Sequence, residues 1–170
     1  MADGDEGFEG WYRAVHPRLV TTLAAVTGDA DVAREATDEA LARALERWRR
    51  VSAMTSPEAW TYTVALNVAR RRFRRRRRER EVAAGLGAPP PLAGPAGELW
   101  ALVGSLPERQ REAVVLHHVG DLTEAQVAEV MGVARGTVST NLRRAYDALR
   151  TELDEPAGAD DATTPGGHRG

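Results

Sequence analysis

Seven polar side chains between residues 135 and 144 are of the types that contact the base edges and backbone of double-helical DNA. Arginine can form two parallel hydrogen bonds with guanine, and asparagine can do the same with adenine. Serine and threonine hydroxyls can bond to bases or to phosphates. The seven residues are Arg135, Thr137, Ser139, Thr140, Asn141, Arg143 and Arg144. Together they predict a surface that binds DNA in its major groove.

The apolar residues around this set predict two short helices that would hold it on one surface. Thr123 is a natural N-cap for a first helix that runs to about Met131, and Gly132 suits the left-handed turn that ends such a helix. A second helix begins near Ala134. Its apolar residues recur every three or four positions, at Val138, Leu142, Ala145 and Leu149. This layout is that of a helix-turn-helix, whose second helix enters the major groove.

A plain helical hairpin with a solvated polar face is the alternative interpretation of the same residues. Ala128 and Gly132 are small where the two helices would cross, and small residues let helices approach closely. That feature favours DNA binding over the plain hairpin.

A second basic feature lies in the first half of the chain, where nine of the eleven residues from 70 to 80 are arginine. We call residues 70–80 the Arg block. It continues an amphipathic helix that Ser56 caps and Pro57 opens, so it is not a loose terminal tail. A targeting segment or a membrane-surface patch is the alternative, but the apolar face of this helix is needed for a core. Phosphates would neutralise the block. The polar residues expected to contact nucleic acid are Asn67, Arg70, Arg71, Arg74 and Arg75.

Two further amphipathic helices precede the Arg block. The first covers about residues 8–26 and is expected to be interrupted at Pro17, because proline lacks the amide hydrogen that a helix interior needs. The second runs to about Arg50, with Leu41 and Leu45 among its inward-facing residues. Its first half carries an acidic face that includes Glu35, Asp38 and Glu39, and such a face alone is most often only solvated surface.

The chain divides into two parts at a segment rich in alanine, glycine and proline. Residues 81–97 have no helical period and predict a flexible linker. We therefore expect an all-α protein of two small helical domains, at residues 1–80 and 98–150, with the helix-turn-helix in the second. Residues 151–170 have the composition of a disordered acidic tail.

The composition argues against several other classes of protein. The chain contains no cysteine and no stretch near the roughly 18 apolar residues of a membrane helix, so a cytoplasmic protein is expected. No phosphate-binding loop, metal-ligand cluster or catalytic triad is recognisable, which predicts no enzymatic activity, no metal and no cofactor. His117 and His118 are adjacent, point about 100° apart on a helix, and are interpreted as structural.

The whole pattern resembles an extracytoplasmic-function (ECF) sigma factor of the sigma-70 family. The resemblance covers about residues 8–150 and is strongest in LPERQREAVVLHHVGDLTEAQVAEVMGVARGTVSTNLRRAYDALR, residues 106–150. In the first half, AREATDEALARALERW looks like the family's polymerase-docking helix, and SPEAWTYTVALNVARRRFRRRRR looks like the helix that engages the −10 element. The segments LARALERWRRV and PEAW most resemble those of an actinobacterial subgroup. Asp38, Leu66 and Arg71 depart from the residues that the family often has at these positions.

The resemblance implies a sigma factor that binds core RNA polymerase, at its clamp and flap regions, and directs transcription initiation from promoter DNA. The residues at 135–144 would read the −35 element, and Asn67, Arg70, Arg71, Arg74 and Arg75 would bind the −10 region with the loop at 51–55. Core polymerase would bind Glu35, Asp38, Glu39 and Leu41. An anti-sigma factor is a further expected partner.

Two other functions are compatible with the residues themselves. A stand-alone helix-turn-helix regulator would bind operators without polymerase, although the first 95 or so residues show no ligand-pocket pattern. An RNA-binding adaptor would use the Arg block and have no need of Arg135 or Arg143.

Overall fold

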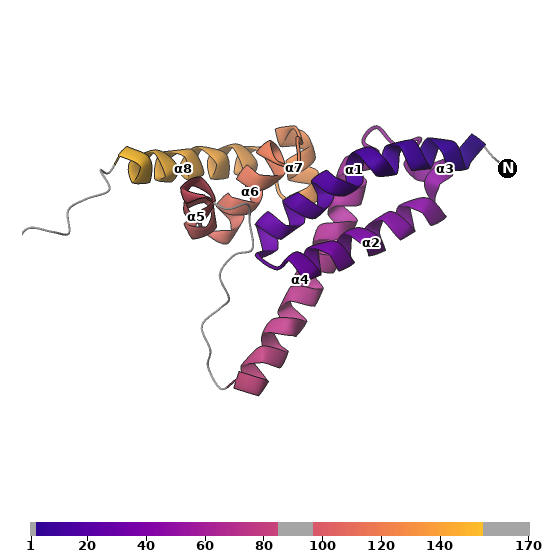
Figure 1. Cartoon of the computed structure of the whole chain (residues 1–170). Helices are drawn as coiled ribbons and strands as arrows, with labels where there is room; N and C mark the ends of the chain where they lie inside the picture. Colours follow the sequence, from indigo (N-terminus) through magenta and orange to yellow (C-terminus); the bar gives the residue numbers. More distant parts are fainter. Residues whose placement is uncertain (1–2, 85–96, 155–170) are drawn as a thin grey trace, which may run out of the picture.

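The computed structural model describes residues 3–84 and 97–154, and all its regular structure is α-helical (Figure 1). We call residues 3–84 the N-terminal half and residues 97–154 the C-terminal half. The helices of the N-terminal half are α1 (Asp3–Thr27), α2 (Ala30–Glu46), α3 (Trp48–Val51) and α4 (Pro57–Ala84). Those of the C-terminal half are α5 (Glu98–Ser105), α6 (Glu108–His118), α7 (Glu124–Met131) and α8 (Arg135–Asp154). The predicted all-α class is confirmed.

The first helix passes through Pro17, so the predicted interruption there was wrong. A proline inside a helix leaves the carbonyl four residues earlier without its amide partner. Pro17 lies on the exposed side of α1, where water can solvate that carbonyl. The opposite side of the helix buries Val15, Leu19 and Leu23 completely. Burial of this stripe keeps α1 continuous despite the lost hydrogen bond.

The second helix begins at a defined cap and ends earlier than the sequence suggested. Gly28 adopts a left-handed φ of 68°, and the Asp29 carboxylate accepts hydrogen bonds from the amides of Asp31 and Val32. The predicted helix to Arg50 is instead two helices, with a break at Arg47 between α2 and α3. Leu45 was expected to face inward but is 48% exposed. It lies about 40° around the helix from the buried Leu41, beyond the edge of the buried face.

The fourth helix extends four residues into the segment predicted as linker. Ser56 caps it as expected, since its hydroxyl accepts a hydrogen bond from the Ala59 amide at 3.2 Å. Tyr62, which the sequence analysis did not place in the core, is fully buried. Its hydroxyl lies 3.3 Å from that of Thr22, and burial raises the pKa of the phenol. The C-terminal part of α4 projects away from the other helices (Figure 1), and the other predicted linker residues, 85–96, lie outside the described residues.

The predicted helix-turn-helix is present in the C-terminal half. Thr123 caps α7 in a reciprocal arrangement with Gln126, in which each side chain bonds the other residue's amide. Gly132 ends α7 with φ 68° and ψ 38°. The following helix, α8, buries Val138, Leu142 and Ala145 and continues to Asp154, four residues into the predicted tail. Residues 155–170 of that tail lie outside the described residues.

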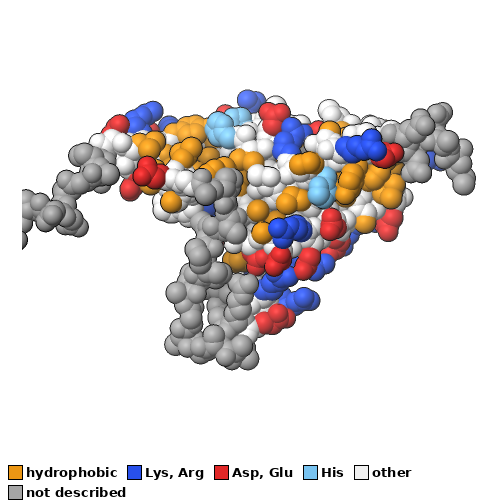
Figure 2. All heavy atoms as spheres, in the orientation of Figure 1, with side chains coloured by type: hydrophobic (Ala, Val, Ile, Leu, Met, Phe, Trp, Pro, Cys, Tyr) orange, Lys and Arg blue, Asp and Glu red, His pale blue; other side chains and the backbone are white. Residues whose placement is uncertain are grey.

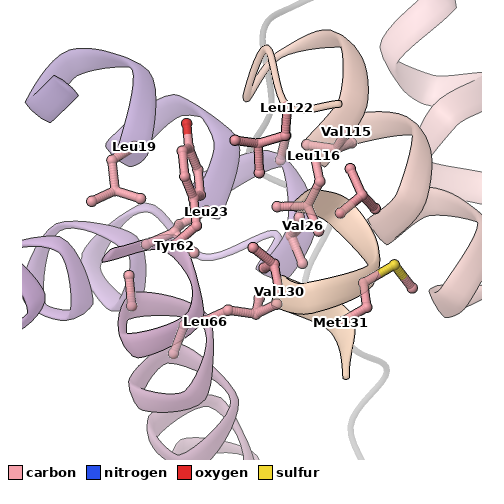
Figure 3. Close-up of a cluster of buried hydrophobic side chains, with 14 of the residues drawn as sticks. Leu19, Leu23, Val26, Tyr62, Leu66, Val115, Leu116, Leu122, Val130 and Met131 are labelled. Carbon is pink, nitrogen blue, oxygen red and sulfur yellow. The ribbon is translucent and has the colours of Figure 1, made fainter. Parts of the chain in front are cut away.

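One hydrophobic core joins the two halves. Helix α7 packs on α4, and α6 packs on α1. The close-up in Figure 3 draws side chains from both halves in a single buried cluster. The N-terminal half contributes Leu19, Leu23, Val26, Tyr62 and Leu66, and the C-terminal half contributes Val115, Leu116, Leu122, Val130 and Met131. The two predicted domains are therefore packed against each other.

Replacement of Gly132, in the turn of the helix-turn-helix, should destabilise the protein. In Gly132→Ala a Cβ would meet no atom within 4 Å, so the left-handed backbone is the source of strain, and we expect a loss of about 1 kcal/mol in unfolding free energy. Gly136→Ala, in open space at the start of α8, is the matched control and should gain roughly 0.5–1 kcal/mol. Urea unfolding of both variants checks this, and equal changes would contradict it.

Candidate nucleic-acid interface

The polar face of α8 is presented to solvent as a continuous surface. Arg135, Thr137, Ser139, Arg143 and Arg144 are exposed, whereas Thr140 and Asn141 are half-buried. The buried residues of α8 occupy the opposite side and pack on α6 and α7. All seven side chains predicted to read DNA thus have access to a ligand that approaches α8 from outside.

Glu124, at the first position of α7, contacts the start of this surface. The Ser139 hydroxyl donates a hydrogen bond to its carboxylate at 2.5 Å, and Arg135 Nε lies 3.9 Å from the same oxygen. The Arg135 side chain is still 74% exposed. An exposed ion pair at that distance contributes little stability, so Arg135 can exchange Glu124 for a base or a phosphate at small cost.

The predicted −10 residues on α4 differ in their environments. Asn67, Arg71, Arg74 and Arg75 are exposed, and Arg75 Nε lies 3.4 Å from Glu79 one turn further on. Arg70 instead points toward the C-terminal half and forms an ion pair with Glu112 of α6, which is 1% exposed. Four of the five residues therefore share an accessible surface, and the fifth is held between the two halves.

The other side of the Arg block binds the acidic face of α2, a role that the sequence analysis missed. Arg72 donates to Glu35 at 2.6 Å and to Glu39 at 2.9 Å, and Arg76 donates to Glu35 at 2.7 Å. The hydrogen bond from Arg72 lowers the pKa of Glu39. Figure 2 shows acidic and basic side chains intermixed where α2 and α4 run together. The spacing in the sequence could have indicated this contact. Arg72 and Arg76 are four residues apart, and so are Glu35 and Glu39.

One residue of the predicted polymerase-docking set on α2 is buried. Asp38 is exposed, with His16 Nε2 3.7 Å from its carboxylate, while Glu35 and Glu39 are half-buried in the pairs just described. Leu41 is 2% exposed and belongs to the core, so it cannot contact another protein from this position. Leu45 is the apolar residue that this side of α2 exposes. Of the predicted docking residues Asp38 is therefore accessible and Leu41 is not, and the exposed surface of α2 also carries Leu45.

Arg111 and the two histidines hold the C-terminal half together. Arg111 donates to the Gly104 carbonyl at 3.0 Å and so ties the end of α5 to α6. His117 Nδ1 lies 2.7 Å from the Leu122 carbonyl, and His118 Nε2 lies 2.8 Å from the Tyr146 hydroxyl. These contacts agree with a structural role for both histidines. The described residues contain no cluster of His, Asp or Glu that could hold a metal, and none of the described helices has the length and apolar character to cross a membrane.

An exposed helix-turn-helix beside an arginine-rich helix is typical of DNA-binding proteins. Comparison with known proteins identifies the family. Residues 11–79 match the family described as Sigma-70 region 2, and residues 96–149 match Sigma-70, region 4. The chain is 31% identical over 147 residues to the ECF RNA polymerase sigma factor EcfG of Rhodopseudomonas palustris, which covers 82% of this chain and 81% of that protein. It is 26% identical over 152 residues to the RNA polymerase sigma-E factor of Streptomyces coelicolor, covering 86% and 85%. The chain belongs to the ECF sigma factors of the sigma-70 family.

Two solved structures share the fold over nearly the whole chain. One is the sigma factor RpoE in complex with the anti-sigma factor NepR from Bartonella quintana, with a TM-score of 0.73, 22% identity, and coverage of 89% of this chain and 99% of that one. The other is CnrH in complex with the cytosolic domain of CnrY, with a TM-score of 0.61, 19% identity, and coverage of 90% and 91%. At these identities the likeness establishes the fold alone.

Proposed function

We propose that this sigma factor divides promoter recognition between its two halves, with α8 reading the −35 element and α4 binding the −10 region. The observation that carries the proposal is the exposed polar face of α8 on a capped helix-turn-helix. In this motif the N-terminal residues of the second helix lie nearest the base edges. Arg135 and Ser139, near the start of α8, would contact bases, and Arg143 and Arg144, further along the helix, would contact phosphates.

At the −10 region the exposed side of α4 would bind the DNA backbone. Arg71, Arg74 and Arg75 are exposed along consecutive turns, and Asn67 precedes them on the same side. The loop between α3 and α4 leads directly into this helix and would hold unstacked bases. Flipping a base costs a few kcal/mol, which phosphate contacts and stacking must offset.

Docking on core RNA polymerase would use the exposed side of α2, with Leu45 as its apolar anchor and Asp38 as its charged neighbour. The C-terminal half would contact the flap region. Leu45 supports this proposal because it is 48% exposed in a helix whose other leucine is buried. Glu35 and Glu39 would act mainly through α4, since Arg72 already neutralises both.

Leu45→Ala should weaken binding to the clamp of core polymerase about tenfold, because truncation of an interface anchor costs roughly 1–2 kcal/mol. Leu153→Ala removes another exposed leucine, at the end of α8, and is the matched control. Titration of both variants against the isolated clamp domain measures the effect. The docking surface would have to be sought elsewhere if the two variants bound equally.

Three further features belong to the proposal. The protein acts in the cytoplasm, where polymerase and promoter DNA are found. An anti-sigma factor is a regulatory partner, in keeping with the two fold relatives, whose structures were solved with such factors. The LARALERWRRV and PEAW phrasing supports placement in an actinobacterial subgroup.

A further inference from the structure

The contact between the halves includes a carboxylate that is almost fully removed from water. Glu112 lies on α6 and is 1% exposed, and its carboxylate forms ion pairs with Arg70 of α4 and, at 3.0 Å, with Arg109. Burial raises the pKa of Glu112, and the two arginines oppose that change. A buried carboxylate without a cation is strongly destabilising, so Glu112 needs Arg70 and Arg109 as its partners as long as the halves remain together.

Two more polar contacts and the shared core hold the same interface. Gln126 at the start of α7 donates to the Ser56 hydroxyl at the start of α4 at 2.8 Å. Arg18 of α1 reaches Asp121 at 3.3 Å while also bonding Glu58 at 2.9 Å. Leu66, one of the departures from the family pattern, is fully buried in the cluster that both halves share. The interface is therefore apolar at its centre and has ion pairs and hydrogen bonds around it.

This arrangement is incompatible with reading both promoter elements at once. Positions −35 and −10 are on the order of 25 base pairs apart, which is about 85 Å of B-DNA. A compact unit the size of the C-terminal half has a radius of gyration of about 10 Å. Because the C-terminal half touches Arg70 directly, its α8 cannot lie that far from the −10 surface of α4. The two halves must separate before both surfaces bind one promoter.

The same interface leaves other surfaces open. The polar face of α8 is exposed, and α2 packs on α1, α3 and α4 with its Asp38 and Leu45 free of the C-terminal half. Arg70 is the one proposed DNA contact on α4 that the C-terminal half occupies. Packing of the two halves therefore blocks a residue of the −10 surface of α4 and leaves the −35 surface of α8 accessible.

We infer that the free protein is held closed by a latch in which Glu112 occupies Arg70 in place of a promoter phosphate. Core polymerase can dock on α2 of the closed protein, and separation of the halves then transfers Arg70 from Glu112 to the DNA backbone. A DNA phosphate then replaces the Glu112 carboxylate at the same guanidinium, so Arg70 keeps a negatively charged partner when the halves separate. This inference rests on the proposed −10 role of α4.

A cleavable cross-link across the interface tests the latch, and the absence of cysteine from the chain makes the chemistry selective. Ser56→Cys with Gln126→Cys places two thiols on side chains that are in contact, and a short, reductant-cleavable bismaleimide would lock the halves together. The locked protein should bind a −35 duplex and the clamp domain as the cleaved protein does. Its affinity for promoter DNA carrying both elements should fall more than tenfold, because avidity between the two sites is lost. Cleavage of the spacer should restore binding and run-off transcription.

Full run-off transcription by the locked protein would overturn the inference. Failure of the proposed function gives a different result, since the unlinked protein would then support no run-off at all.

Glu112→Gln tests the role of the carboxylate itself. Loss of the charge should free Arg70, raise the affinity of the polymerase-free protein for a −10 single strand at least threefold, and slow formation of the 56–126 cross-link. Glu108→Gln, which removes an exposed carboxylate one turn earlier on α6, is the control and should change neither. Unchanged affinity and cross-linking in Glu112→Gln would rule out Glu112 as the latch.

Discussion

Leu23→Ala should lower the free energy of unfolding by about 2–5 kcal/mol, the range found when a fully buried leucine is truncated in a core that cannot collapse. Leu23 is completely buried on α1, within the cluster that joins the two halves. Truncation removes apolar contacts and leaves a cavity in this cluster. Leu45→Ala is the matched control, because the same atoms are removed from a half-exposed side chain, and its change should stay within about 0.5 kcal/mol.

Urea unfolding measured separately in each half extends this test. Trp60 lies in the N-terminal half and Trp100 in the C-terminal half, so single-tryptophan versions report on each. A shared core predicts that both probes follow one transition and that Leu23→Ala moves both midpoints together. Two separate transitions, with only the Trp60 signal shifted, would show that the halves fold independently.

The double variant Arg135→Ala/Arg143→Ala should weaken binding to a −35 duplex on the order of 100-fold. An arginine that contacts a base is worth roughly 1–3 kcal/mol, and a phosphate contact contributes less but adds to the salt dependence. Both side chains are exposed on α8, and neither packs in the core, so the fold should be unaffected. Loss of Arg143 should also reduce the slope of affinity against salt by about one unit.

Arg150→Ala provides the control for that variant. Arg150 is exposed on the same helix, about 22 Å from Arg135 at the usual rise per residue, and its nearest charge is Asp147 at 3.7 Å. Its replacement should change −35 affinity by less than twofold. If Arg150→Ala weakened binding as much as the double variant, a general charge effect would replace the assignment of α8 as a reading surface.

The helix-turn-helix could be predicted from the sequence because each of its determinants is local. Thr123 and Gln126 cap α7 within one turn, Gly132 adopts the left-handed conformation by itself, and Val138 and Leu142 mark the buried face of α8 by spacing alone. The solvent-facing side that carries the seven polar residues follows from the same periodicity. No information from elsewhere in the chain was needed.

Contacts between distant segments could not be predicted in the same way. The Arg block was identified as basic, but its division between Arg72, which binds α2, and Arg70, which binds α6, depends on how three helices pack. Leu41 and Leu45 are leucines one turn apart on α2. Leu41 is buried and Leu45 is exposed because the buried face of the helix ends between them. Periodicity shows that a helix has an apolar face, but not which helix covers it.

The packing of the two predicted domains against each other could not be predicted for the same reason. The sequence predicts α1 and α4 as amphipathic helices, yet it does not show that α6 covers part of α1 and α7 part of α4. Glu112 was equally hidden, since a glutamate in an amphipathic helix is normally solvated. The closed arrangement, and the latch inferred from it, come from the structure.

Run-off transcription on a panel of promoter fragments, with core polymerase in the presence and absence of this protein, tests the central claim most directly. We expect specific transcripts that require the protein, and we expect Arg135→Ala/Arg143→Ala to abolish them while Arg150→Ala leaves them intact. Tight binding of the protein alone to operator duplexes, with no transcript that depends on both protein and core across a panel that other sigma factors transcribe, would contradict the account.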